Sequence, residues 1–522
     1  MTADTPTTDL FIIGGGINGV GIARDATGRG LSVALAEMDD LASATSSAST
    51  KLFHGGLRYL EYFEIRLVRE ALKEREVLLR AMPHISWPMR FVLPYHKDMR
   101  FENDTPVSKL LSFVMPWMRG RRPAWLIRMG LFMYDHMGAR KILPGTRTLN
   151  LADDPAGVPL QPKYRKAYEY SDCWVEDSRL VALNAVDAAR RGAQIMIRTK
   201  VINAAREGDL WKVTTKDMVS GKSRIHYARA LVNAGGPWVK ELLDGVLNHQ
   251  TNERIRLVRG SHIVVPGLFD HDRAYFFQGQ DGRIIFAIPY ETDFTLIGTT
   301  DAAHPDADTP AICTAEEQEY LCAFASNYFA QPVTVDQIIW SFAGVRPLYD
   351  DGSSSATAAT RDYVIALADD APTAPLLNIF GGKITTYRKL AETALERLSP
   401  FFPDLPDEWT AGAALPGGDF SVNGGDNLLH DIQARYPFLD DKWAKRLLRA
   451  YGTDVFTLLG EAKSTDDLGQ HFGWNLYARE VEWLVNNEFA QTTDDILWRR
   501  SKMGLRLNAT ETKGLKDFLN NL

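Results

Sequence analysis

The sequence predicts an α/β protein with a discontinuous nucleotide-binding domain, a β-rich second domain and an all-α C-terminal domain. Three observations predict this fold class. An apolar strand at 10–13 runs into a glycine turn and a helical segment, short strands crowd the interval 254–298, and helical periodicity dominates from residue 428 onward. With 522 residues, the chain has room for two or three domains.

The N-terminal unit has the spacing of a dinucleotide-binding turn. The first strand leads into Gly-Gly-Gly-Ile-Asn-Gly at 14–19, and the residues that follow have a helical pattern. Gly14 allows the tight turn, Gly16 lets a pyrophosphate approach the backbone, and Gly19 lets the helix pack close to the strand. A second apolar strand ends at Glu37, whose carboxylate is placed to accept a hydrogen bond from a ribose hydroxyl. The alternative interpretation is a glycine turn that binds nothing.

Two more strands, far apart in the sequence, also end on glycines. The apolar run 230–234 stops at Gly235-Gly236-Pro237-Trp238, and the run 376–380 stops at Gly381-Gly382 before a long helical pattern. A glycine at a strand end allows a ligand to approach the backbone closely. Because parallel strands end at the same edge of a sheet, we expect the three junctions to form one ligand site there.

Composition and charge exclude several classes of protein. The chain is 45% hydrophobic and 24% charged, as in an ordinary globular protein, and its net charge of -7 argues against general nucleic-acid affinity. Three scattered cysteines form neither a metal-ligand pattern nor a disulfide framework. The polar start has no basic signal-peptide region, and no run of about eighteen apolar residues is present. We therefore expect a cytoplasmic protein without a metal that does not cross a bilayer.

The segment 105–135 is the candidate for contact with a membrane surface. It interleaves apolar stretches with tryptophans and arginines, among them Trp117, Arg119, Trp125 and Arg128. Aromatic rings at headgroup level and cations facing anionic lipid are typical of an interfacial anchor. The alternative is an amphipathic helix packed on the protein's own core.

Several long motifs carry a resemblance to one family. They are Gly14–Tyr59, Tyr170–Val175, Gly260–Pro266, Ile297–Asp301, Gly344–Leu348, Thr360–Tyr363 and Gly381–Lys389. Over nearly the full length, the chain resembles the FAD-dependent, respiratory glycerol-3-phosphate dehydrogenases. The resemblance implies FAD in a glutathione-reductase-like domain, and oxidation of sn-glycerol 3-phosphate to dihydroxyacetone phosphate with electrons passed to a membrane quinone. Between 97 and 122 the chain looks longer than the family pattern, outside the motifs.

The patterns and the resemblance together set the expected domains and partners. The FAD-binding domain comprises 1–90, 165–245 and 340–400, the substrate domain 91–164 and 246–339, and the helical domain 401–522. The expected partners are glycerol 3-phosphate, a quinone, the inner face of the cytoplasmic membrane and a second copy of the chain. Two alternatives stay open: an oxidase that returns electrons to oxygen, and a flavin-binding sensor without turnover.

His54 is the expected catalytic base for the substrate hydroxyl. It lies just after the hydroxyl-rich run 45–50 that is expected along the flavin, and a glycine beside it allows close approach. A structural histidine is the alternative for His54. His262 is the competing base, although its place within an apolar strand favours a satisfied core residue.

Four cations are expected to serve the substrate phosphate and the flavin. Arginine's fork matches phosphate oxygens, and a lysine can neutralise the remaining charge. The family resemblance implies that Arg346 and Arg58 lie closest to the reacting centre and that Arg361 and Lys383 lie nearer the phosphate or flavin, and Tyr59 is expected to add a hydroxyl contact. A structural salt bridge is the alternative for each cation. The expected cofactor-binding residues are Gly14, Gly16, Asn18, Gly19, Glu37, Thr45, Ser46, Ser47, Ser49, Leu57, Val201, Gly235, Gly236, Trp238, Gly382, Lys383 and Thr385.

Overall fold

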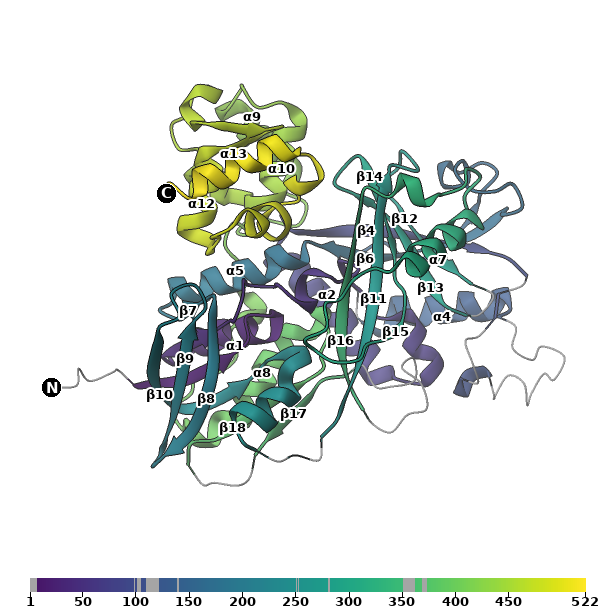
Figure 1. The fold of residues 1–522 in the computed structure, drawn as a ribbon. Coiled ribbons are helices and arrows are strands. Elements are labelled where there is room, and N and C mark those ends of the chain that lie inside the picture. The colour runs from purple at the N-terminus through teal and green to yellow at the C-terminus, as the bar shows by residue number, and fades with distance from the viewer. Residues whose placement is uncertain are drawn as a thin grey trace.

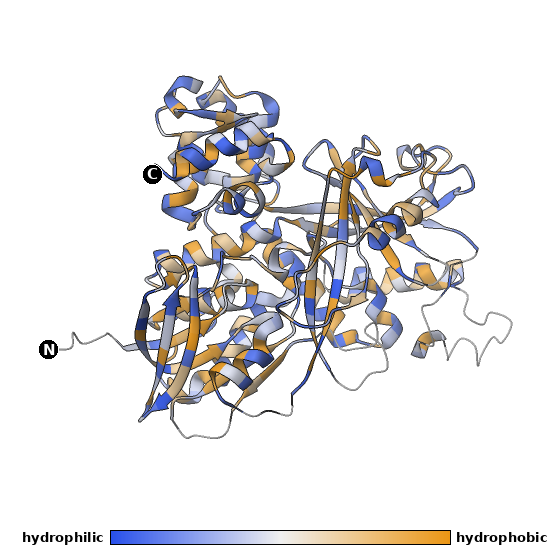
Figure 2. Cartoon of the chain, in the orientation of Figure 1, coloured by the Kyte–Doolittle hydropathy of each residue, from blue (hydrophilic) through white to orange (hydrophobic). Residues whose placement is uncertain are grey.

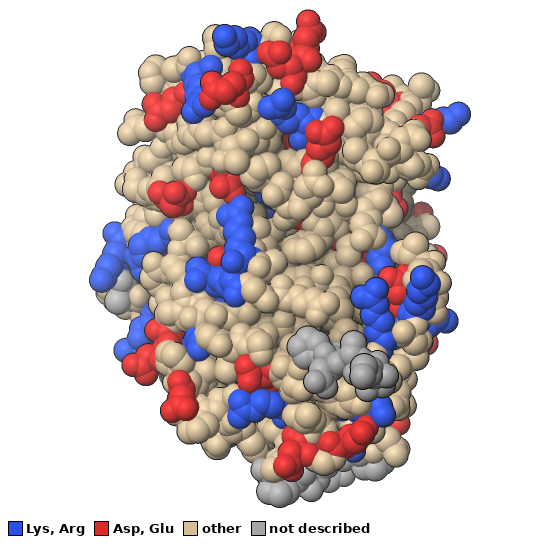
Figure 3. Space-filling view, turned by 90° about the vertical axis from the view of Figure 1, so that its left-hand side faces the viewer, with Lys and Arg blue, Asp and Glu red and all other residues tan. Residues whose placement is uncertain are grey.

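The computed structural model contains two large sheets and a C-terminal helical domain, and the predicted fold class is confirmed (Figure 1). The structure describes residues 7–97, 99–100, 105–108, 122–138, 140–249, 251, 253–279, 282–350, 362–368 and 373–522. Figure 2 shows hydrophobic residues along the strands of both large sheets. On the face in Figure 3, basic and acidic side chains of the described residues are interspersed, which does not favour an extended polyanion there.

The first sheet holds the three strands that end on glycines. Its order is β17 (Val364–Leu367), β18 (Leu376–Phe380), β10 (Ser223–Asn233), β1 (Thr7–Ile13), β2 (Val33–Ala36) and β7 (Gln194–Met196), with β8 (Thr199–Glu207) and β9 (Leu210–Asp217) extending β10. β1 runs parallel to β10 and β2, and β10 runs parallel to β18. The expected junctions therefore lie side by side at one edge of the sheet.

Three helices cover the central strands of this sheet. They are α1 (Ile17–Gly28), α5 (Asp177–Arg190) and α8 (Tyr387–Leu398), and their apolar residues pack with those of β1 and β10 in one core. Leu10 and Ile12 are fully buried. Burial on both faces explains why β1 is a continuous apolar run rather than an alternating one.

The second sheet is mostly antiparallel. Its order is β15 (Ala302–Ala303), β11 (Ile255–Pro266), β14 (Phe294–Gly298), β13 (Ile284–Tyr290), β12 (Ala274–Gln278), β4 (Ser86–Tyr95), β6 (Lys166–Val175) and β3 (Leu52–Phe53), with β5 (Arg147–Asn150) on β6 and β16 (Trp340–Tyr349) on β11. β4 and β12 are parallel neighbours. Three further helices belong to this half: α2 (Ile65–Ala81), α4 (Ala124–Met137) and α7 (Ala315–Ser326).

Three strands differ from the expected domain boundaries. β3 lies within the expected nucleotide-binding range 1–90, β6 lies within 165–245, and β16 lies within 340–400, yet all three belong to the second sheet. β6 pairs with β4 from Ser86–Val175 to Tyr95–Lys166, and β16 pairs with β11 along almost its whole length. A strand belongs to the sheet whose backbone groups pair with its own, so sequence position alone does not assign these strands to a domain.

The C-terminal domain is mainly helical but not all-α. Its helices are α9 (Gly425–Arg435), α10 (Asp441–Tyr451), α11 (Val455–Leu459), α12 (Ala478–Glu488) and α13 (Ala509–Leu519), and a hairpin of β19 (His471–Gly473) and β20 (Leu476–Tyr477) interrupts them. Its own apolar core holds the domain together. The helical domain was predicted but the hairpin within it was not, because two- and three-residue strands give no usable periodicity in the sequence.

One short element of the C-terminal domain, η13 (Asp495–Arg500), contacts both halves of the rest of the protein. Arg500 donates to both carboxylate oxygens of the fully buried Asp40, at 2.8 and 2.7 Å, and Arg499 also bonds to Asp40. Trp498 stacks on Trp340 of β16, with ring centroids 4.5 Å apart. The loop after β2 and the strand β16 are thus held by the same six residues.

Candidate cofactor and substrate site

The three glycine junctions line one cavity of about 580 Å³. Gly14 has a φ of +111°, and a Cβ there would lie 2.5 Å from the carbonyl oxygen of Ala234 at the end of β10. Gly382 also has a positive φ, of +110°, and a Cβ there would lie 3.1 Å from Asn18. Gly14 therefore lies so close to the end of β10 that only glycine fits there, and Gly382 lies similarly close to Asn18 of α1.

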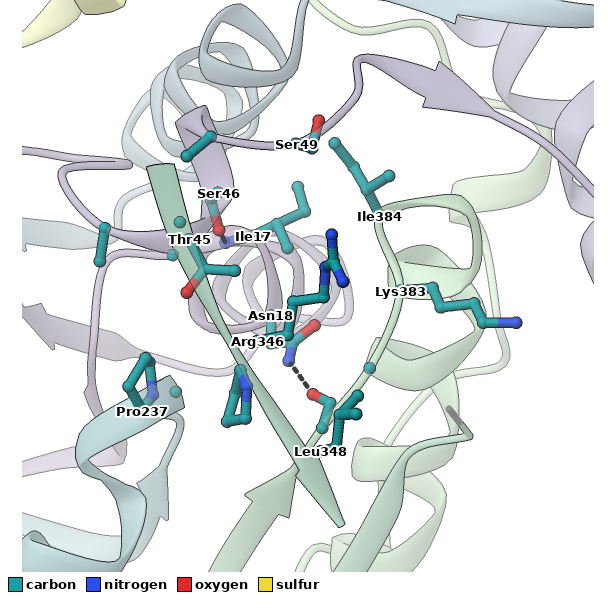
Figure 4. Close-up of a pocket in the computed structure, with 18 of the residues that line it drawn as sticks. Ile17, Asn18, Thr45, Ser46, Ser49, Pro237, Arg346, Leu348, Lys383 and Ile384 are labelled. Carbon is teal, nitrogen blue, oxygen red and sulfur yellow. Dashed lines mark hydrogen bonds between the residues drawn. The ribbon is translucent and has the colours of Figure 1, made fainter. Parts of the chain in front are cut away.

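The start of α1 forms the phosphate-binding part of this cavity. Ser46 Oγ accepts a hydrogen bond from the Ile17 amide at 3.0 Å, and Asn18 Nδ2 donates to the Gly381 carbonyl at 3.1 Å (Figure 4). These two bonds tie the hydroxyl-rich run and the third junction to the helix N-terminus. A helix N-terminus favours an anion, so the geometry suits the pyrophosphate of a dinucleotide.

Glu37 lies at the end of β2 inside the same cavity. Its carboxylate accepts hydrogen bonds from the Gly15 amide at 2.7 Å and the Asp39 amide at 2.9 Å. Burial raises the pKa of Glu37 to about 7, against the lowering effect of these two bonds. Since both neighbours donate, the ionised carboxylate is the form suited to accept a ribose hydroxyl as well.

We expect the affinity of the apoprotein for FAD to fall as the pH falls below about 7. A raised pKa means that Glu37 takes up a proton in this range, and FAD binding must release that proton, so affinity can drop by about tenfold per pH unit. Titration of FAD into apoprotein from pH 5.5 to 8.5, followed by flavin fluorescence, measures how this affinity depends on pH. Glu37→Gln should flatten the profile, and a wild-type affinity that does not change with pH would contradict the assignment.

Most of the expected cofactor-binding residues line the cavity. They are Gly14, Gly16, Asn18, Glu37, Thr45, Ser46, Ser49, Leu57, Val201, Gly235, Gly236, Trp238, Gly382, Lys383 and Thr385. Gly19 and Ser47 do not line it. Gly19 lies beneath the turn, where a Cβ would be 1.9 Å from the Gly14 carbonyl oxygen, and the Ser47 carbonyl accepts from Lys51 instead. The two residues support the walls of the cavity.

Both candidate bases lie at the cavity wall, in different surroundings. The His54 amide donates to Thr385 Oγ1 at 3.3 Å, which joins the loop after β3 to the third junction. His262 is buried on β11, stacks on Phe342 with centroids 4.8 Å apart, and pairs with Thr50 Oγ1 at 3.0 Å. Burial, with help from nearby cations, holds the pKa of His262 well below its usual range, which makes it a weak base near neutral pH.

Three of the four expected cations line the cavity, and Arg361 lies outside the described residues. Arg346 extends from β16 between Ile17 and Ile384 in Figure 4. It forms an ion pair with Asp301 and donates to Thr299 Oγ1 at 2.9 Å, so the salt-bridge alternative is realised at a residue that also faces the cavity.

The other two cations are associated with the loop that follows His54. Lys383 Nζ lies 3.8 Å from the centroid of the Tyr59 ring, a cation–π contact across the cavity wall. Arg58 and Tyr59 belong to the 3-10 turn η2 (Leu57–Tyr62), which also lines the cavity. The cavity is therefore rich in cationic groups at the end nearest His54.

The structure adds cavity residues that the sequence argument did not single out. They include Tyr62, Asp172, Phe276, Phe286 and Asp301. Asp172 and Asp301 lie in two of the motifs that carry the family resemblance, so a charged residue within such a motif was the available signal. The aromatic residues of β12 and β13 gave no signal, because strand aromatics are mostly core residues.

Models of two protein families match the chain. A model of FAD dependent oxidoreductases matches residues 9–388, and a model of the C-terminal domain of alpha-glycerophosphate oxidase matches residues 409–516. The fold, the glycine-lined cavity and these matches define an FAD-dependent oxidoreductase.

Known relatives extend over nearly the whole chain. It is 47% identical to D-erythritol 1-phosphate dehydrogenase of Brucella abortus (strain 2308), covering 99% of both chains. It is 46% identical to aerobic glycerol-3-phosphate dehydrogenase of Escherichia coli (strain K12), covering 98% of this chain and 97% of the relative. A structure of glycerol-3-phosphate dehydrogenase from Bacillus halodurans, complexed with FAD, matches with a TM-score of 0.73 and 27% identity over 98% of this chain and 89% of that one. The chain belongs to the FAD-dependent glycerol-3-phosphate dehydrogenase family.

Proposed function

We propose that this protein oxidises the secondary alcohol of sn-glycerol 3-phosphate to the ketone of dihydroxyacetone phosphate and passes the electrons to a membrane quinone. The observation that carries the proposal is that Arg346 and His54 line the same cavity as the glycine junctions. The full-length similarity to enzymes named for this substrate supports it.

Different residues of the cavity would bind the cofactor and the substrate. FAD, when bound, supplies the hydride acceptor. The start of α1, Ser46 and Glu37 would hold its pyrophosphate and ribose. Arg346, with its planar fork of donors, would hold the substrate phosphate or the developing carbonyl, and His54 would take the hydroxyl proton. Phe276 of β12 and Phe286 of β13 line the same cavity.

Anaerobic mixing with glycerol 3-phosphate tests the proposal. The visible absorbance of the bound flavin should bleach within seconds, and absence of bleaching would overturn the proposal. Reoxidation then separates the alternatives. Hydrogen peroxide formed in air at the rate of substrate oxidation would indicate an oxidase, whereas turnover that depends on added ubiquinone or menaquinone supports the quinone.

A four-carbon polyol phosphate is the second candidate substrate. It is favoured by the similarity to a relative named D-erythritol 1-phosphate dehydrogenase, which is as high as that to the glycerol 3-phosphate enzyme. Both substrates offer a phosphate and a secondary alcohol to the same chemistry. The ratio of kcat/KM for the two substrates, measured by flavin-coupled dye reduction, decides between them.

The exposed face of α4 supports membrane contact and quinone access. Trp125, Met129 and Phe132, at 49, 47 and 56% exposure, recur at helical spacing on one face, while Leu131 and Tyr134 on the other face are buried. Phe63 is also exposed and directly follows η2, whose residues line the cavity. None of the described helices has both the length and the apolarity to cross a bilayer. We include peripheral docking through this face, on the cytoplasmic side, in the proposal, together with a homodimer that light scattering can test.

The double variant Trp125→Ser/Phe132→Ser should bind vesicles containing anionic phospholipid at least tenfold more weakly. Each aromatic ring that leaves water contributes about 1.5–3 kcal/mol, so losing two outweighs any remaining attraction by Arg128. Co-sedimentation at fixed salt measures the partition. Ile312→Ser, which removes an exposed apolar side chain elsewhere, is the matched control. Equal partition of the double variant and the wild type would exclude α4 as the docking face.

A further inference from the structure

A buried polar network fixes the peptide that follows His54. The Gly55 amide donates to Tyr134 Oη at 2.7 Å, and Tyr134 Oη donates to the Asp172 carboxylate at 2.8 and 3.0 Å. Tyr134 and Asp172 are 2 and 3% exposed. The network therefore links the loop of the candidate base to α4 and to β6, without water between them.

The network is charge-balanced from the side opposite the cavity. Arg75 of α2, itself buried, forms an ion pair with Asp172 and donates to the Ser171 carbonyl at 2.8 Å. Burial raises the pKa of Tyr134 well above its usual value, so the hydroxyl stays protonated. Its hydrogen forms the hydrogen bond to Asp172. The hydroxyl oxygen remains an acceptor, and the Gly55 amide donates to it.

The loop is closely packed at Gly55. A Cβ at Gly55 would lie 2.5 Å from Leu72 and 2.8 Å from the Tyr134 ring. On its other side the loop is tied by the bond between the His54 amide and Thr385 Oγ1. His54 is thus held between Tyr134 on one side and the third glycine junction on the other. Asp172 itself lines the cavity, so the network reaches the wall of the site.

We propose that Tyr134 is a positioning residue for catalysis, which holds the His54–Arg58 loop in its reactive geometry through the Gly55 amide. Tyr134 does not touch substrate in this scheme. It limits the positions that His54 and Arg58 can adopt, and small displacements of reacting groups have large effects on rate. The inference rests on the proposed function only for the choice of substrate.

The test compares Tyr134→Phe with Tyr168→Phe. Both tyrosines are 2% exposed and pack in the same core, but the Tyr168 hydroxyl donates to the Ala124 carbonyl, away from the loop. The two changes remove the same atom, so any general loss of stability appears in both. Thermal unfolding of each holoenzyme establishes that the variants fold and bind FAD.

Two readouts then isolate the positioning role. Hydrogen exchange in peptides that span 52–58 should be faster in Tyr134→Phe than in Tyr168→Phe and the wild type. The limiting rate of flavin reduction by glycerol 3-phosphate should fall about 10- to 100-fold in Tyr134→Phe alone, with FAD affinity unchanged. Asp172→Asn, which keeps the shape but weakens the acceptor for Tyr134, should change exchange in the same direction.

Exchange and reduction in Tyr134→Phe that match those of Tyr168→Phe would overturn the inference. Failure of the proposed function looks different. In that case the wild type itself is not reduced by glycerol 3-phosphate, and the exchange comparison, which needs no substrate, still decides whether Tyr134 holds the loop.

Discussion

Replacement of Arg346 by alanine is expected to lower kcat/KM for glycerol 3-phosphate by about 10²–10³-fold, or roughly 3–4 kcal/mol of transition-state stabilisation. Arginine's charged fork makes two parallel bonds to an oxyanion, and bonds to charged groups are the strong ones. The loss is compounded by Asp301, which pairs with Arg346 at the cavity wall. Without the arginine, its carboxylate is left facing an anionic substrate. Stopped-flow reduction of the bound flavin over a range of substrate concentrations measures the effect.

Three further variants identify the origin of this loss. Arg346→Lys keeps the charge but not the fork, so it should recover only part of the activity. Asp301→Asn combined with Arg346→Ala should be more active than Arg346→Ala alone, because the uncompensated carboxylate is gone. Arg256→Ala is the matched control, since Arg256 pairs with Asp350 and does not line the cavity. An Arg346→Ala enzyme with wild-type flavin reduction would show that the anion clamp lies elsewhere.

The second large effect is expected at Gly19. Gly19→Ala places a Cβ 1.9 Å from the Gly14 carbonyl oxygen, and a backbone atom in the phosphate turn cannot rotate out of the way. α1 must move off β1, at a cost of about 3 kcal/mol or more, and the N-terminus of α1 leaves its place in the cavity. The variant should therefore be purified without flavin, and its affinity for added FAD should fall by more than about 100-fold.

The control for Gly19→Ala is the same substitution in an open helix. Gly514 lies inside α13, and a Cβ there meets nothing within 4 Å. Gly514→Ala should bind FAD normally and stabilise the protein slightly, by about 0.5–1 kcal/mol, because alanine is the better helix former. Full flavin content in Gly19→Ala would mean that the turn relaxes without moving the helix. Circular dichroism of both variants shows whether the fold is retained.

The three glycine junctions were predictable from the sequence because each combines an apolar run with a glycine cluster. Such a pattern is local in the sequence. Because parallel strands end at the same edge of a sheet, the three local patterns together predict one site. The same reasoning does not give the full length of every strand. Arg229 lies inside β10 and Gly260 inside β11, and neither ends its strand, because pairing with a neighbouring strand continues past it.

The parts of the site that were not predicted depend on partners distant in the sequence. Tyr134 and Asp172 are 38 residues apart, and Arg75 and Asp172 are 97 apart, with no periodicity to connect them. The pairing of Arg346 with Asp301 has the same character. A sequence can show that a charged residue lies in an apolar segment, where burial would be costly. Only the fold shows which residue of opposite charge pairs with it.

The ion pairs between η13 and Asp40 have a consequence for the synthesis and folding of the protein. Asp40 and Arg500 are 460 residues apart, and at about 5–20 residues per second the ribosome needs roughly 20–90 s to deliver the second after the first. The nucleotide-binding sheet is also completed late, because β18 is translated long after β1. The nascent chain thus carries the apolar first strand without its β10 neighbour until residue 233 has been made, and the cofactor cavity is incomplete until Thr385 has been made. Cells that make this enzyme quickly should depend on chaperones that shield the N-terminal strand until the last helices arrive.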